Sequence, residues 1–128
     1  MQLLDDDGEF LRGKGLVWEL LPDGSGYCIV IKDFPVNAAK YNRSSVQLMI
    51  CVPAGYNDAK LDNFYVDPWL HIKATAAPPH QANVPEKHAG RDWQRFSRHL
   101  PTWRAGVDTL RTFWPHIIKE LQQPGSQP

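Results

Sequence analysis

The feature that most restricts the fold is a set of four β-rich runs within residues 15–73, separated by clusters of turn residues. The runs are GLVWELL, YCIVIKDFPV, SVQLMICVP and FYVDPWLHIK. The cluster PDGSG between the first two predicts a hairpin whose loop is longer than the tightest type. The proline inside the fourth run predicts that this strand lies at a sheet edge. We therefore expect a meander of four antiparallel strands.

The stretch AGVDTLRTFWPHIIKEL predicts a C-terminal helix. Its apolar residues recur at helical spacing: Val107, Leu110, Phe113 or Trp114, Ile117 or Ile118, and Leu121. Asp108 is a candidate cap for this helix, and Pro115 is expected to kink or split it. Strands followed by a helix indicate an α+β fold.

A single domain is expected from the length of 128 residues. Residues 1–14 contain three consecutive aspartates and no helical apolar period, which predicts a flexible N-terminal lead-in. Residues 122–128, QQPGSQP, predict a disordered tail, so that the domain covers residues 15–121. Residues 74–92 contain three prolines and no apolar period. They predict a long irregular loop of the kind that is functional or disordered.

The charge balance and the cysteines narrow the functional classes. Lys+Arg and Asp+Glu both number 14, so the net charge gives no general support for binding nucleic acid or an acidic membrane. The first residues, MQLLDDDGEF, do not resemble a signal peptide, and no apolar run is long enough to span a bilayer. Cys28 and Cys51 lie in apolar runs, where a thiol ordinarily behaves as a small hydrophobic group. We expect a cytoplasmic protein.

The stretch WQRFSRHLPTW, residues 93–103, carries the strongest chemical signal. Four apolar residues in it follow the period of one helical face, which predicts that they are core residues: Trp93, Phe96, Leu100 and Trp103. Ser97 and His99 share a side only in an extended or turn conformation, which Pro101 favours at the residue before it. A serine nucleophile needs a base and donors for the oxyanion. A buried turn and a catalytic pair both remain open.

Other kinds of site have weaker support. The serine has no Gly-x-Ser-x-Gly context, and no glycine loop for phosphates is present. The five histidines form no zinc-ligand spacing, so neither a metal nor a cofactor is expected. Basic residues outnumber acidic ones between Pro85 and Arg111 and alternate with tryptophans. This pattern makes a nucleic-acid surface an alternative, although a solvated face above an aromatic core is the commoner origin.

The order of these parts resembles the ubiquitin-conjugating superfamily. The stretches VPAGYNDAKLDNFYVDP and WQRFSRHLPTWRAGVDTL resemble in particular the prokaryotic ubiquitin-conjugating-like family E, over most of residues 15–121. The resemblance implies a ubiquitin-conjugating-like fold, with a four-stranded antiparallel meander, an active-site loop and a C-terminal helix. It also implies a transferase of a bacterial ubiquitin-like modification pathway, for which antiphage defence is a plausible purpose. The implied partners are a ubiquitin-like modifier, a ubiquitin-activating-like enzyme and a JAB-type metalloprotease.

The resemblance also implies roles for individual residues. In the superfamily, a cysteine that precedes a tryptophan carries the modifier as a thioester. If Trp103 matches that tryptophan, the carrier position falls at or near Ser97, which implies an oxyester or a fold that has lost transfer chemistry. The stretch HQANV is the nearest match to the superfamily's His-Pro-Asn motif. His80 is the histidine of this match, and Asn83 is its asparagine. The resemblance implies that the Asn83 amide stabilises the oxyanion.

Further residues near the serine are assigned supporting roles. His99 is expected to act as the base for Ser97, with His88 as a reserve. Arg95 and Arg98 are expected either to guide the C-terminal tail of the modifier or to lie on a solvated surface, and Trp93 supports the turn. Three functions therefore remain: an oxyester carrier, an inactive scaffold that binds the modifier or a partner, and a nucleic-acid-binding domain.

Overall fold

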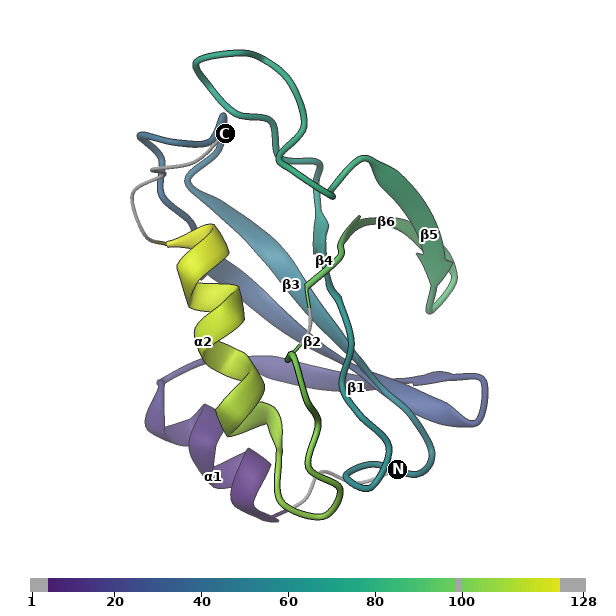
Figure 1. Cartoon of the computed structure of the whole chain (residues 1–128). Coiled ribbons are helices and arrows are strands. Elements are labelled where there is room, and N and C mark those ends of the chain that lie inside the picture. Colours follow the sequence, from purple (N-terminus) through teal and green to yellow (C-terminus); the bar gives the residue numbers. More distant parts are fainter. Residues whose placement is uncertain (1–4, 99, 123–128) are drawn as a thin grey trace.

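The computed structural model describes residues 5–98 and 100–122 and has an α+β fold (Figure 1). One six-stranded sheet has the order β1-β2-β3-β4-β6-β5, and every neighbouring pair is antiparallel. The elements are α1 (Asp5–Gly13), β1 (Trp18–Asp23), β2 (Gly26–Pro35), β3 (Ser45–Val52), β4 (Phe64–Asp67), β5 (Val84–His88), β6 (Arg91–Phe96) and α2 (Leu110–Leu121). The α+β class is confirmed, but the sheet contains two strands more than the four expected.

Both helices lie on one face of the sheet and form the main core with it (Figure 1). Side chains alternate between the two faces of a strand, so Ile29 and Ile31 of β2 point toward the helices. Helix α2 buries its apolar stripe against them: Leu110, Phe113, Trp114, Ile117 and Leu121. Burial of this stripe stabilises the packing of α2 on the sheet, by about 25 cal/mol per Å² of apolar area removed from water.

The opposite face of the sheet carries a second, smaller core. It consists of Cys28, Val30, Met49, Tyr65 and Trp93. The β5–β6 hairpin lies away from α2 (Figure 1), and it contributes Trp93 to this core. Successive side chains of a strand point to opposite faces of the sheet. Because both faces are buried here, both sets of side chains must be apolar, which explains the continuous apolar run of β2.

The two edge strands, β1 and β5, meet although they are farthest apart in the strand order. Asp23 at the end of β1 and His88 at the end of β5 lie 2.9 Å apart, between Oδ2 and Nδ1. The backbone N–H of Ala89 also donates to Asp23 Oδ1 at 3.3 Å. The sheet is therefore curled so strongly that its edges come together at one corner.

The β5–β6 hairpin replaces much of the long irregular loop expected at residues 74–92. Ala89 and Gly90 form its two-residue turn, and both have positive φ angles, of 51° and 82°. Two positive φ angles are the requirement of the hairpin turn whose twist matches that of the strands. Pro85 is tolerated because β5 is an edge strand. The prediction of an irregular loop was wrong. Ala-Gly is not a typical hairpin-turn sequence, and a proline within β5 argues against a strand.

Three other expectations about the strands also need correction. The loop between β1 and β2 contains only Gly24 and Ser25, so the hairpin is tight. Strand β4 lies between β3 and β6 rather than at an edge, and Pro68 follows its last residue. Trp93 and Phe96 belong to strand β6 and not to a helical face. They lie in different cores, one on each face of the sheet.

The helices differ from expectation at their ends. Residues 1–14 were expected to form a flexible lead-in, but they include α1. Three aspartates in the first turn of α1 interact favourably with the positive end of the helix dipole, and Leu11 is fully buried. Thr109, not Asp108, caps α2 through its side chain. Helix α2 continues through Pro115 without splitting. The expected tail at residues 122–128 lies outside the described part except for Gln122, and neither described helix is long and apolar enough to cross a membrane.

Candidate functional site

Ser97 lies directly after β6, where two neighbouring segments hold the backbone. Its N–H donates to the carbonyl of Gln81 at 3.0 Å. The carbonyl of the next residue, Arg98, accepts the N–H of Asn63 at 2.7 Å. Ser97 itself is half-buried. The serine is thus fixed in position by the segments before β4 and before β5, while part of it remains accessible.

Arg98 anchors this segment to α2 through a buried ion pair. Its guanidinium donates to Glu120 Oε1 at 2.7 and 3.1 Å and to the carbonyl of His80 at 2.8 Å. The side chains of Arg98 and Glu120 are only 18% and 9% exposed. An arginine fork that binds a carboxylate and a carbonyl together has little freedom to reach a partner. The Arg98 side chain is therefore held between α2 and the segment before β5.

Glu120 is the centre of a larger polar network. It accepts hydrogen bonds from Tyr41 Oη at 2.9 Å and Lys40 Nζ at 3.3 Å in addition to those from Arg98. Burial by itself would raise the pKa of Glu120, but the Arg98 guanidinium and these neighbours stabilise the carboxylate and hold its pKa below the usual range. The network connects three segments: the one before β3, the one after β6 and the end of α2.

Trp103 joins the segment after Ser97 to the loop after β3. Its Nε1 donates to the carbonyl of Asn57 at 3.0 Å, and its ring lies 6.3 Å from that of Tyr56. The Asn57 amide donates in turn to the carbonyl of Asp108 at 2.9 Å. The loop after β3 and the segment before α2 are consequently joined around Trp103. Trp103, which was predicted to be a core residue, is half-buried and packs against the main core.

Asn83 and His80 belong to the segment that pairs with Ser97. Both side chains are exposed, and the segment reaches Ser97 through the carbonyl of Gln81. The structure therefore places the backbone of the HQANV stretch beside that of the serine. His99 lies outside the described residues.

Three residues assigned to the same site lie elsewhere. His88 is at the far end of the β5–β6 hairpin. Strand β6 is six residues long, so at about 3.3 Å per residue it separates His88 from Ser97 by roughly 20 Å. Arg95 donates to Glu86 Oε1 at 2.9 Å, and Trp93 Nε1 donates to the carbonyl of His88 at 3.1 Å. These residues support the hairpin rather than the serine.

Sequence reasoning missed a cluster at the curled corner of the sheet. Cys28 and Cys51 are cross-strand partners, and their sulfurs lie 3.4 Å apart. Their mutual hydrogen bond lowers the pKa of Cys28 and raises that of Cys51, because one shared proton stabilises one thiolate and disfavours a second. His88 and Asp23 adjoin the pair. Only the register of β2 and β3 reveals the partnership, since the cysteines are distant in sequence and each lies in an apolar run.

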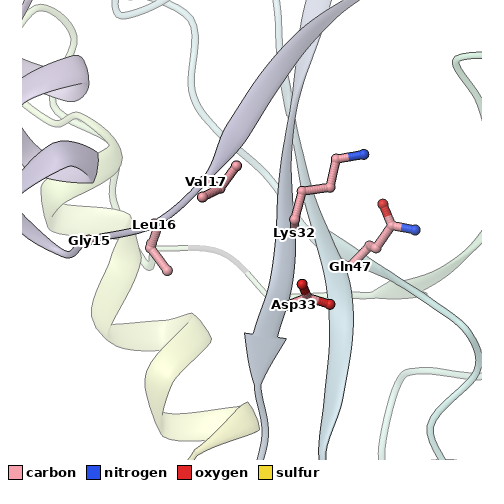
Figure 2. Close-up of a pocket in the computed structure, with 6 residues that line it drawn as sticks. All are labelled: Gly15, Leu16, Val17, Lys32, Asp33 and Gln47. Atoms are coloured by element: carbon pink, nitrogen blue, oxygen red, sulfur yellow. The ribbon is translucent and has the colours of Figure 1, made fainter.

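A shallow pocket lies on the part of the sheet formed by β2 and β3, near the connection from α1 to β1 (Figure 2). Its volume is about 590 Å³, and it is lined by Gly15, Leu16, Val17, Lys32, Asp33 and Gln47. None of these residues belongs to the Ser97 segment, and β4 separates β3 from β6. The pocket contains no residue that the sequence assigned to chemistry.

These features define an α+β protein in which the last strand leads through a fixed serine segment into a helix. The model of the family described as prokaryotic E2 family E, where E2 denotes the ubiquitin-conjugating type, matches residues 3–124. The chain belongs to this family. No curated protein and no solved structure matches it. Family membership supports a conjugating-type carrier with a transferase-type role, whose partners in general are a modifier and an activating enzyme.

Proposed function

We propose that this protein carries a ubiquitin-like modifier as an oxyester on Ser97 and transfers it to a target. The observation that supports this most is the fixed backbone of Ser97 and Arg98, bonded to Gln81 on one side and to Asn63 on the other. A carrier must present its nucleophile in one geometry to an activating enzyme and then to an acceptor. Ser97 satisfies this requirement and remains partly accessible.

The position of the two cysteines supports the same choice. Cys28 is completely buried in the second core, and Cys51 is half-buried beside it. Both lie in the sheet, on strands β2 and β3, at the core to which the β5–β6 hairpin contributes Trp93. A modifier attached to either sulfur would have to disrupt that core. The burial of the thiols thus supports a hydroxyl as the carrier.

The proposed chemistry has two steps. Ser97 Oγ attacks the C-terminal carbonyl of the modifier, which the activating enzyme holds as a thioester, so that a C–O bond forms and the C–S bond breaks. The hydroxyl proton passes to the base, for which we propose His99, and the Asn83 amide stabilises the oxyanion. An amine of the target then attacks the oxyester, a C–N bond forms as the C–O bond breaks, and the base returns its proton to Ser97. The amine releases one proton to solvent, which balances the thiolate that left on the activating enzyme in the first step.

The biological setting that we propose is a bacterial ubiquitin-like modification pathway. Its other members are the activating enzyme, the modifier and a JAB-type metalloprotease that removes it. A scaffold that only binds the modifier is the alternative, and it differs in one observable respect, since a scaffold forms no covalent adduct. Nucleic-acid binding is the second alternative, and it is less favoured because Arg95 and Arg98 are both engaged in ion pairs.

The test is an adduct assay with the full chain, the activating enzyme, the modifier and ATP. We expect an adduct that survives reductant and is cleaved by mild alkali, since an oxyester resists thiols and hydrolyses in base. Ser97→Ala should abolish it. Ser97→Cys should convert it into an adduct that reductant cleaves, because the ester becomes a thioester.

The matched control is Ser44→Ala, which removes the hydroxyl of an exposed serine just before β3. This variant should form the adduct at the wild-type level. If no adduct forms with the wild-type protein, or if it persists in Ser97→Ala, the oxyester proposal is wrong. A complex with the modifier that survives without any adduct would instead identify the scaffold.

A further inference from the structure

The cluster at the curled corner of the sheet has the composition of a zinc site. Its four members come from the ends of β1 and β5 and from the paired strands β2 and β3: Asp23, Cys28, Cys51 and His88. One ligand atom from each residue lies within 4.8 Å of all the others. Two thiolates, an imidazole and a carboxylate are ligands that Zn²⁺ commonly takes.

The spacing of these atoms fits tetrahedral coordination. With Zn–S bonds of about 2.3 Å, two sulfurs on one zinc lie about 3.8 Å apart, and the sulfurs of Cys28 and Cys51 lie 3.4 Å apart. His88 Nδ1 and Asp23 Oδ2 lie 2.9 Å apart, where bonds of about 2.1 Å to zinc require roughly 3.4 Å. These two pairs need to separate by about half an ångström, and the other pairs of ligand atoms, which lie within 4.8 Å, need to reach roughly 3.6 Å.

The surroundings of His88 match those of a metal ligand. Its second ring nitrogen, Nε2, faces Glu86 Oε2 at 2.6 Å. The Glu86 carboxylate is itself held by Tyr65 Oη at 2.8 Å and by Arg95 at 2.9 Å. A carboxylate that accepts the N–H of a ligating imidazole fixes the tautomer and directs the other nitrogen toward the metal. This chain of contacts leaves Nδ1 facing Asp23 Oδ2, within the cluster that holds the two sulfurs.

The location explains what a metal would do. Asp23 and His88 are contributed by the two edge strands, whereas the cysteines belong to the inner strands and to the second core. One ion bound to all four residues would join both edges of the sheet to its second core. Such a closed, four-ligand site is structural, since no position remains open for a substrate. It lies roughly 20 Å from Ser97, so it is separate from the carrier site.

We propose that Cys28, Cys51, His88 and Asp23 bind one Zn²⁺ ion that fastens the β5–β6 hairpin to the β1–β2 hairpin. Binding releases the thiol protons to solvent and leaves the imidazole neutral, with its remaining proton on Nε2 toward Glu86. The proposal is independent of the oxyester, because either one can fail while the other holds.

The test is metal binding by the reduced full-length protein, followed by mass spectrometry of the native chain. We expect one Zn²⁺ per chain, and protection of both thiols from a thiol reagent until a chelator is added. Co²⁺ in place of Zn²⁺ should give a thiolate charge-transfer band and the intense visible bands of tetrahedral cobalt. Cys51→Ser and His88→Gln should lose the stoichiometric ion, and Glu86→Gln should weaken binding by roughly 10–100-fold.

The control is His71→Gln, a histidine in the connection after β4 that contributes nothing to the cluster. It should bind Zn²⁺ and Co²⁺ as the wild-type protein does. Circular dichroism of each variant distinguishes loss of the ligand from loss of the fold. Failure of the folded, reduced wild-type protein to bind either ion would overturn the proposal. A native mass that is two hydrogens lower would also overturn the proposal, because Cys28 and Cys51 would then be joined in a disulfide and could not bind zinc as thiolates.

Discussion

Replacing Arg98 by methionine tests whether the Ser97 segment is held by the buried ion pair. Methionine retains most of the volume of the arginine stem but cannot donate a hydrogen bond. In Arg98→Met, Glu120 loses its two bonds from the guanidinium, at 2.7 and 3.1 Å, and the carbonyl of His80 loses its donor. The Glu120 carboxylate remains buried, with Lys40 and Tyr41 as its only other side-chain partners among the described residues.

The magnitude follows from the burial of the pair. Removing one member of a buried ion pair typically costs 3–5 kcal/mol, since it leaves an uncompensated charge. Here the Arg98 side chain is 18% exposed and Lys40 stays within 3.3 Å of Glu120. We therefore expect a loss near the lower limit, about 3 kcal/mol of unfolding free energy. In Arg98→Met combined with Glu120→Gln, part of this loss should be recovered, because the unpaired carboxylate is then neutral.

The assay is urea unfolding with linear extrapolation, with Arg111→Met as the control. Arg111 also forms an ion pair, with Asp6, but the two side chains are 54% and 58% exposed. An exposed pair contributes about 0–1 kcal/mol, so this variant should stay close to the wild-type protein. The reasoning is refuted if Arg98→Met is no more destabilising than the control. If it is supported, adduct formation on Ser97 should decline in Arg98→Met under conditions where the protein remains folded.

Two further predictions concern the loop after β3 and the segment before α2. The Arg104 guanidinium and its backbone N–H hold the pKa of Asp108 at about 2, so the stability that this carboxylate contributes is present above its ordinary pKa and is lost as the pH falls toward 2. Asp108→Asn should therefore lower the melting temperature at pH 7 and make little difference at pH 2; a constant difference between these pH values would contradict the assignment. Tyr56→Phe removes the donor to buried Asp7 and the acceptor for the N–H of Leu110, so it should cost about 1–3 kcal/mol in urea unfolding, and a loss within experimental error would show that neither bond contributes.

The sequence predicted those elements whose residues follow a single period. Strands β1, β2 and β3 and helix α2 were expected close to where they lie, because β-branched runs and a helical apolar stripe are local signals. The class α+β followed from them. The same reasoning failed for β6, since Trp93 and Phe96 are three apart and both buried, as on a helix, although they face opposite sides of a sheet.

The candidate site was predictable only in part, for a related reason. The proximity of Ser97 to the HQANV stretch depends on the β5–β6 pairing, which neither segment reveals alone. The role of Arg98 depends on Glu120, which lies 22 residues later on another element. The cysteine cluster depends on the register of β2 and β3 and on the curl of the whole sheet. Sequence identifies residue types, whereas these contacts are set by tertiary packing.

The central claim is tested most directly by locating the modifier on the chain. The full pathway is allowed to react, the protein is digested at acidic pH, where an oxyester survives, and the peptides are sequenced by mass spectrometry. The account predicts that the C-terminal residues of the modifier are attached to Ser97. Attachment to Cys51, to a lysine or to any other residue, or a chain that remains unmodified, would contradict it.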